Sequence, residues 1–144
     1  MAVSEFDTSS GRQQFCAGST PLAWLSKIGR RDENQDAADR HLDTDSGWLM
    51  CVADGPGGHS RGKAASRRAI EALPDDIDTP ATMHKGVSTA HEQVATLSPR
   101  DFQPTRTNAR SCPVSTLCIA ARTSADGLIV GFAGDTVAAL VRRL

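Results

Sequence analysis

The stretch that decides the fold runs from Leu49 to Ser66 and reads LMCVADGPGGHSRGKAAS. The run of residues 47–54 is almost wholly apolar and ends in the carboxylate of Asp54. A continuous apolar run of this length is typical of a strand that is buried on both faces. A glycine-rich turn follows, and a helical period begins at Gly62. The stretch therefore predicts a buried strand, a carboxylate at its end and a helix that packs back onto the sheet.

Two helices are predicted after this strand, because small and apolar residues recur there at steps of three and four. The first begins near Ser60, whose side chain can cap it, and ends at Pro74. The second begins at Thr79-Pro80, with proline at the first helical position, and ends at Ser98-Pro99. The residues expected on the two buried faces are Gly62, Ala65, Ser66, Ala69, Ile70 and Leu73, and then Met83, Val87, Ala90, Val94 and Leu97.

The N-terminal part carries weaker signals. Residues 1–14 are polar and predict a disordered tail, so the domain is expected over residues 15–144. Residues 15–28 contain Pro21, which indicates an edge strand or a break between two short strands. Residues 35–42 predict an exposed strand.

The C-terminal part reads as an antiparallel meander. Residues 99–113 are rich in proline and predict a loop. Residues 115–122 and 127–134 predict a hairpin joined by an Asp-Gly turn, and residues 136–144 predict a last strand. Strands on either side of a helical pair favour an α+β fold, with helices packed on antiparallel sheet.

Composition sets the broad class. A chain of 144 residues with a net charge of −1 and no basic block is typical of one soluble domain without a nucleic-acid surface. No run approaches the roughly 18 apolar residues of a membrane span, and the N-terminus lacks the pattern of a secretory signal. Cys51 and Cys118 sit in apolar strand-like runs, where a thiol acts as a small hydrophobe, and no Cys-x-x-Cys pair occurs. We therefore expect a reduced, cytoplasmic protein.

Asp36 and Asp54 are the candidate metal ligands. A short turn at residues 43–47 joins their strands, so pairing of these strands would bring both carboxylates to the same end of a sheet. Asp54 and the carbonyl of Gly55 offer hard oxygen ligands, which suit Mg²⁺ or Mn²⁺ better than zinc. Two ions about 3.5–4 Å apart that share a carboxylate could generate hydroxide and clamp a phosphoryl group. Arg31 would supply the forked donor that a phosphate prefers.

Plainer interpretations compete with a metal site. Asp54-Gly55 after a strand is also a common turn, and the charged segment around Asp36 also suits a solvated loop. The loop at residues 55–62 precedes a helix and could bind an anion, because helix N-termini attract phosphate. It fits neither G-x-x-x-x-G-K-[ST] nor G-x-G-x-x-G, so a nucleotide-binding fold is disfavoured.

Together and in this order, three blocks resemble the PPM family, the metal-dependent (type 2C) serine/threonine protein phosphatases. The first block is GRRDENQD at residues 29–36, and the second, most specific block is VADGPGGHSRGKAAS at residues 52–66. The third, VSTLCIAARTSADGLIVGFAGDT at residues 114–136, is similar to the family's Thr-Thr strand followed by its Gly-Asp-Ser turn.

The resemblance implies a partial α-β-β-α sandwich, with two Mn²⁺ or Mg²⁺ ions in a cleft at one end. Asp54 would bridge the two ions, Gly55 would bind one through its carbonyl, and Asp36 would hold the centre directly or through water. Arg31 would bind the substrate phosphate. A metal-bound hydroxide would then attack phosphoserine or phosphothreonine of a protein substrate, without a covalent enzyme intermediate.

Several positions depart from the family pattern. Pro56 stands where some members carry a histidine proposed as general acid, so water or another side chain must protonate the leaving group. His59 is a candidate for that acid, but we interpret it first as a structural residue of the glycine-rich loop. Gln35 replaces an acid often found in its place, and Asp135-Thr136 replaces Asp-Ser and is interpreted as a turn. The chain contains neither the Ser-Asp-Gly nor the Asp-Asn motif that supplies further metal carboxylates in the family. It reads as the N-terminal portion of such a domain, or as a short protein with an incomplete site.

Two main hypotheses follow. The first is a phosphatase domain that acts in signal transduction and is inactive as an isolated chain, because two carboxylates hold divalent ions weakly. The alternative is a catalytically inactive, phosphatase-like module that binds a partner, and its uncovered sheet also invites self-association. A third, less favoured interpretation is a generic anion-binding domain whose Gly57-Gly58 loop binds phosphate regardless of Mn²⁺.

Overall fold

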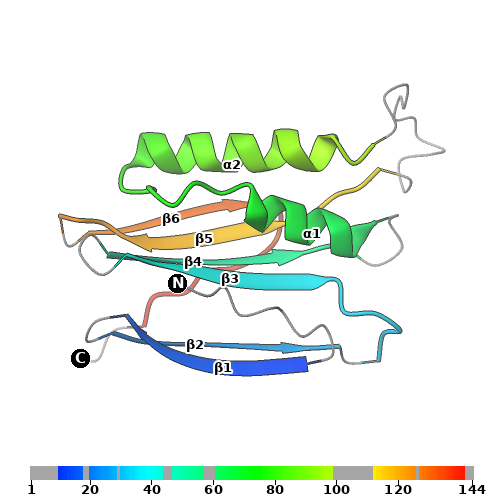
Figure 1. Cartoon of the computed structure of the whole chain (residues 1–144), viewed down its shortest axis with the longest axis horizontal. Coiled ribbons are helices and arrows are strands. Elements are labelled where there is room, and N and C mark those ends of the chain that lie inside the picture. The colour runs from blue at the N-terminus through cyan, green and yellow to red at the C-terminus, as the bar shows by residue number, and fades with distance from the viewer. Residues whose placement is uncertain are drawn as a thin grey trace.

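Two antiparallel sheets and two helices make up the described part of the chain (Figure 1). The computed structural model describes residues 10–17, 20–28, 30–43, 47–56, 61–98, 112–125 and 127–141. Along the chain the elements are β1 (Ser10–Ala17), β2 (Thr20–Lys27), β3 (Asp36–Asp43), β4 (Gly47–Asp54), α1 (Gly62–Glu71), α2 (Pro80–Ala95), β5 (Leu117–Arg122) and β6 (Leu128–Ala133).

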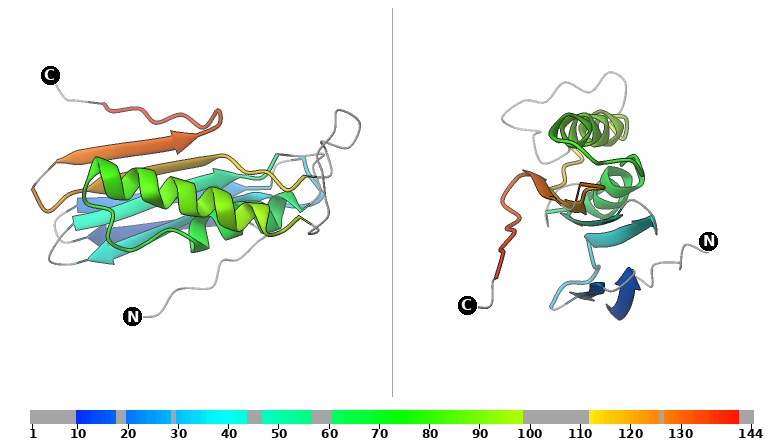
Figure 2. Two further views of the ribbon diagram at one scale, coloured as in Figure 1. Left: turned by 90° about the horizontal axis from the view of Figure 1, so that it is seen from above. Right: turned by 90° about the vertical axis from the view of Figure 1, so that its left-hand side faces the viewer.

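These elements form three layers. The helices α1 and α2 cover one face of a four-stranded sheet of order β3-β4-β5-β6, and the two-stranded sheet β1-β2 lies on the other side (Figures 1 and 2). Every pairing in both sheets is antiparallel. The expected α+β class, with helices packed on antiparallel sheet, is confirmed.

The core lies between the helices and the helix-facing side of the larger sheet. On β4, Leu49 and Cys51 are buried, whereas Val52 is 42% exposed. The prediction that this strand is buried on both faces is therefore wrong. Helices cover one face only, and the small sheet makes its contacts with β3. The core residues are Ala37, Leu49, Cys51, Ala53, Ala65, Ala69, Ile70, Leu73, Ile77, Met83, Ala90, Val94, Leu117, Ile119 and Ala121.

Both predicted helices form where their periodicity places them. The predicted face of α1 is buried throughout, and that of α2 is buried or half-buried. Thr79 caps α2 in a reciprocal capping box with Thr82, and Pro80 occupies the first helical position. The N-cap of α1 is Arg61, in the left-handed conformation (φ 62°) and without a side-chain cap. The predicted cap, Ser60, lies outside the described residues.

The N-terminal predictions need correction. Strand β1 begins at Ser10, so residues 10–14 belong to a strand and not to a tail, while residues 1–9 lie outside the described part. This part of β1 is polar, and backbone pairing with β2 is what makes it a strand. Pro21 lies within β2, which suits a sheet of two strands because each strand has an open edge. On β3, Ala37 and Ala38 are buried, so that strand is not exposed as predicted; α1 packs against it on one side.

At the C-terminus the β5–β6 hairpin is confirmed, but the last strand is not. Residues 134–141 have no strand structure, and residues 142–144 lie outside the described part. No described strand pairs with this segment, so its backbone has no ladder to join. Its apolar side chains Val137, Leu140 and Val141 are consequently exposed.

Cys51 and Cys118 behave as buried apolar residues, as predicted. Burial raises the pKa of the Cys51 thiol to about 12 and also raises the pKa of Cys118. Among the described residues these two and Cys112 are free thiols. Neither α1 nor α2, the helices in the described part of the chain, has the length and apolarity needed to cross a membrane.

Candidate metal centre

Asp36 and Asp54 lie directly opposite each other at one end of the larger sheet. Strand β3 begins at Asp36 and β4 ends at Asp54, and the antiparallel register pairs these two residues. The β-carbons of directly opposed residues are about 4.5–5.5 Å apart, so both carboxyl groups can reach one ion. The prediction that the two carboxylates share one end of the sheet is confirmed.

The two carboxyl groups perturb each other. Partial burial at the strand end, the negative charge of Asp54 and a hydrogen bond to the Asp54 carboxyl raise the pKa of Asp36 above its ordinary value of 3.8, while Arg31 opposes the rise. Two carboxylates that share one site cannot both ionise freely without a cation between them. The pair is therefore a negative site that a divalent cation would stabilise.

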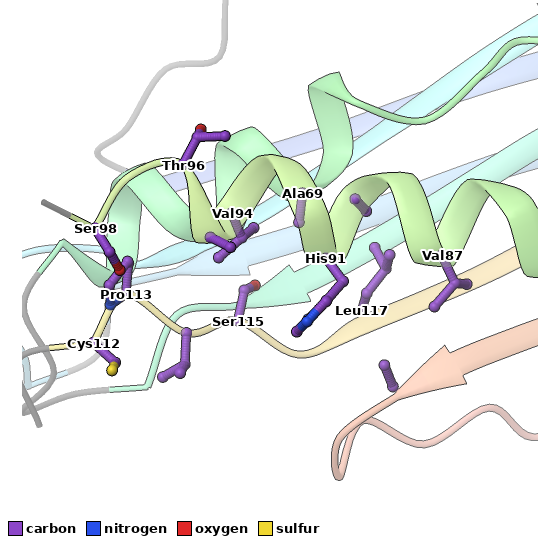
Figure 3. A pocket seen from close by; sticks show the side chains of 14 residues that line it. Ala69, Val87, His91, Val94, Thr96, Ser98, Cys112, Pro113, Ser115 and Leu117 are labelled. Carbon is purple, nitrogen blue, oxygen red and sulfur yellow. The ribbon is translucent and has the colours of Figure 1, made fainter. Parts of the chain in front are cut away.

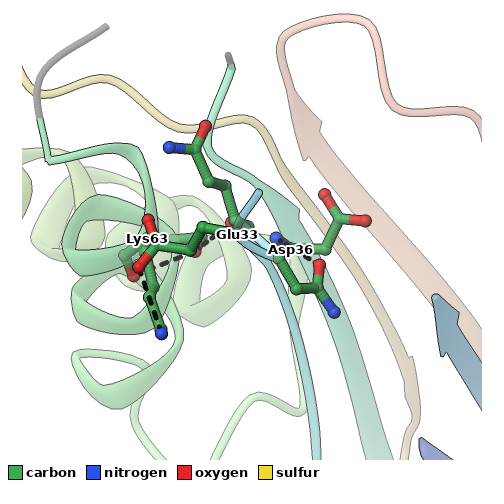
Figure 4. A network of polar contacts seen from close by, with 6 residues as sticks. Glu33, Asp36 and Lys63 are labelled. Atoms are coloured by element: carbon green, nitrogen blue, oxygen red, sulfur yellow. Dashed lines mark hydrogen bonds and ion pairs between the residues drawn. The ribbon is translucent and has the colours of Figure 1, made fainter. Parts of the chain in front are cut away.

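The loop before β3 brings Arg31 near this pair. Its backbone N–H donates to the carbonyl of Ile28 (3.3 Å), and its exposed guanidinium lies close enough to Asp36 to influence that carboxyl. Glu33, from the same loop, forms an ion pair with Lys63 of α1 (3.2 Å). Figure 4 shows this pair on the helix side of the loop, with the Asp36 side chain directed away from it. The positive charge of Lys63 is thus paired with Glu33, whereas the charge of Arg31 acts on Asp36.

Asn34 holds the segment of chain that leads into Asp36. Its Oδ1 accepts a hydrogen bond from the Asp36 backbone N–H (3.2 Å), and its Nδ2 donates to Ser26 Oγ at the end of β2 (2.7 Å). This side chain ties the small sheet to the start of β3. The asparagine of the first block therefore orients the backbone of Asp36.

Thr116 holds the backbone of Asp54 from the opposite side. The Thr116 backbone N–H donates to the Asp54 carbonyl (2.8 Å), and Thr116 Oγ1 accepts from the Asp54 N–H (3.0 Å). The hydroxyl of Thr136 donates to the same Oγ1 (2.6 Å). Sequence reasoning noted these threonines only as part of a resemblance. The contact of Thr116 with Asp54 was missed, because it joins residues that are 62 positions apart.

Gly55 lies in a place where no side chain fits. A β-carbon on Gly55 would lie 2.1 Å from the carbonyl oxygen of Gly62, and one on Gly62 would lie 2.9 Å from the carbonyl oxygen of Gly55. The Gly55 N–H donates to the carbonyl of Gln35 (3.2 Å). Close backbone contact therefore joins the end of β4, the loop before β3 and the start of α1.

The donor chemistry of this site fits Mn²⁺ or Mg²⁺, which prefer carboxylate and carbonyl oxygens. The donor count is small. Among the residues that the structure describes, no group of three or more His, Cys, Asp and Glu side chains gathers in a way that could hold a metal ion. Residues Gly29, Gly57, Gly58 and His59 of the predicted motifs lie outside the described part. Asp135 is exposed in the turn after β6, consistent with the interpretation of that residue as a turn residue.

A separate cavity of about 840 Å³ lies on the helix side of the sheet, between α2 and residues 112–117 (Figure 3). Its lining includes Val94, Leu117 and His91 and contains no carboxylate. Ser115, which also lines it, has its Oγ 3.3 Å from the carbonyl oxygen of Asp54. The cavity therefore reaches the backbone of Asp54 through Ser115, and the carboxylate pair is not part of its lining.

Comparison with known proteins agrees with this arrangement. No curated protein sequence and no solved structure matches the chain significantly. A family model described as protein phosphatase 2C matches residues 25–143, which is most of the chain and includes the carboxylate pair. This chain belongs to the protein phosphatase 2C family.

Proposed function

We propose that this chain contributes to a metal-dependent phosphatase that hydrolyses phosphoserine and phosphothreonine in proteins. Membership of the family supports a phosphatase that acts on phosphoproteins. The residues assigned to the site are Asp36, Asp54, Gly55 and Arg31.

Each of these residues has a distinct role in the proposal. Asp54 and Asp36 hold two Mn²⁺ or Mg²⁺ ions, with the Gly55 carbonyl as a further ligand. When bound, the cations supply positive charge that activates water and neutralises the phosphoryl group. Arg31 orients the substrate through its forked N–H donors, which match two phosphate oxygens. Pro56 has no proton to give, so the leaving alkoxide takes its proton from water or from another side chain.

One observation carries the proposal: two carboxyl groups from adjacent strands face each other, and burial together with the negative charge of Asp54 raises the pKa of Asp36. Lys63 does not neutralise this pair, because it forms an ion pair with Glu33. Arg31 lowers the pKa of Asp36, but burial and the charge of Asp54 outweigh this effect. A like-charged pair is costly to the fold, and a cation-binding role explains why it is present.

Phosphate release from phosphoserine and phosphothreonine peptides, measured as Mn²⁺ is raised, tests the function. Because two carboxylates bind divalent ions weakly, we expect activity to need millimolar Mn²⁺ or the further carboxylate ligands of a longer polypeptide. Asp54→Asn should lower the rate at least 100-fold, since the metal centre supplies most of the barrier lowering. Asp76→Asn, in the exposed loop between α1 and α2, changes the net charge equally and should leave the rate unchanged. Equal rates for wild type and Asp54→Asn would defeat the metal assignment.

Self-association through the open face of the larger sheet also stays a prediction. On the face away from the helices, Val52, Val130 and Phe132 are 42%, 42% and 65% exposed, and the register pairs Val52 and Phe132 with the same residue of β5. An apolar surface of this kind favours burial against another protein surface. Sedimentation velocity of wild type and Phe132→Lys, over a range of concentrations, distinguishes a dimer from a monomer.

A further inference from the structure

Ser66 is a fully buried hydroxyl on the small-residue face of α1. Its exposed fraction is 0%, and its neighbours on that face are Gly62, Ala65 and Ala69. Alanine would satisfy the packing of such a face equally well. A buried hydroxyl is costly unless it is hydrogen-bonded, so its partner indicates what the serine does.

That partner is the loop that leads into Asp36. Ser66 Oγ donates to the carbonyl of Gln35 at 2.6 Å, and it also lies 3.2 Å from the carbonyl of Lys63 one turn earlier. The Gln35 carbonyl accepts a second hydrogen bond from the Gly55 N–H (3.2 Å). One carbonyl thus links α1 to the residue that precedes Asp36 and to the residue that follows Asp54.

We propose that Ser66 is a positioning residue of the metal centre, whose hydroxyl holds Gln35 and Gly55 together so that Asp36 and Asp54 keep the spacing needed to share a cation. This inference rests on the proposed function and adds to it a residue that touches neither substrate nor ion. The link through Ser66 and Gln35 is called the α1 brace below.

The geometry around the α1 brace gives it little freedom. Gly55 and Gly62 are in direct backbone contact, and Gln35 Oε1 would lie 3.1 Å from a β-carbon on Gly62. If the hydroxyl is removed, the Gln35 carbonyl keeps its longer hydrogen bond from Gly55 but loses its link to Ser66, and the loop can move away from α1. Asp36 is the next residue along that loop, so its carboxyl would move with it.

The test compares Ser66→Ala with wild type in two measurements on the full chain. Mn²⁺ binding, followed by the loss of the electron paramagnetic resonance signal of free Mn²⁺, should weaken about 10- to 100-fold, as for other groups that orient metal ligands. In native-state amide exchange without metal, the Gly55 amide should exchange about tenfold faster in Ser66→Ala than in wild type. This increase should exceed any increase at the buried amides of α2.

Thr79→Ala is the matched control. It removes the capping box of α2 and lowers global stability, but it lies away from the carboxylates. It should leave the Mn²⁺ dissociation constant unchanged and speed exchange at Gly55 no more than at the α2 amides.

The outcomes separate the inference from the proposed function. If wild type binds Mn²⁺ and Ser66→Ala binds it equally well, the positioning role is overturned. Unchanged exchange at Gly55 overturns the α1 brace itself, whether or not metal binds. If Gly55 responds but wild type binds no Mn²⁺, the metal centre fails, and the α1 brace is then a feature of the fold alone.

Discussion

Replacing Asp36 with asparagine should make the metal-free protein more stable and abolish its stabilisation by Mn²⁺. The raised pKa of Asp36 means that the folded state favours the protonated carboxyl. That contribution to stability is fully present below the ordinary pKa of 3.8 and is lost as the pH rises through the raised value. At pH 7 the pair is therefore under charge repulsion, which asparagine removes while its amide can still donate to Asp54.

The magnitude follows from the exposure of both side chains. Solvent screens an exposed pair, so the gain in the free energy of unfolding should be about 0.5–1 kcal/mol, or a rise in Tm of about 2–4 °C. For wild type, Mn²⁺ at a hundred times its Kd should add about 2.7 kcal/mol, and for Asp36→Asn this increase should disappear.

Thermal and urea unfolding at pH 7, with EDTA and with Mn²⁺, measure both effects. Asp76→Asn is the charge-matched control and should change neither. The reasoning is refuted if Asp36→Asn is less stable than wild type in EDTA, since the carboxylate would then be held by favourable contacts. It is equally refuted if the variant keeps the full response to Mn²⁺.

Two further predictions concern the surroundings of the site, and a third concerns the opposite end of the larger sheet. Thr116→Val removes the acceptor of the Asp54 N–H and should weaken Mn²⁺ binding about 10-fold, measured by titration; unchanged affinity would show that Thr116 serves the fold alone. Gly55→Ala places a β-carbon 2.1 Å from the Gly62 carbonyl oxygen and should cost about 3 kcal/mol in urea unfolding, whereas a loss below about 1 kcal/mol would contradict this contact. Two hydrogen bonds from Ser124 lower the pKa of Asp78 below its ordinary 3.8. The stability that the Asp78 carboxylate contributes is therefore present above pH 3.8 and is lost as the pH falls through the lowered pKa. The difference in unfolding free energy between wild type and Asp78→Asn should therefore shrink as the pH falls from 7 to 3, and a constant difference would argue against the pairing.

Much of the fold could be predicted from local patterns. The apolar period placed both helices and the β5–β6 hairpin, and Thr79-Pro80 marked the start of α2, because these signals depend on neighbouring residues. Strand adjacency across one short turn was enough to place Asp36 beside Asp54. These features require no knowledge of distant parts of the chain.

The failures all depend on tertiary partners. Residues 10–14 are polar, and only pairing with β2 makes them a strand. Residues 136–141 have a strand-like composition but no described strand to pair with. The contacts of Thr116 with Asp54 and of Ser66 with Gln35 join segments 62 and 31 positions apart. A local pattern cannot report which distant backbone group a side chain will meet.

The anomalous scattering of Mn²⁺ in crystals grown with the ion tests the central claim most directly. The account predicts anomalous density between the carboxyl groups of Asp36 and Asp54 in wild type, and none there in Asp54→Asn. Mn²⁺ bound only elsewhere on the chain, or density that persists at this place in the variant, would contradict it.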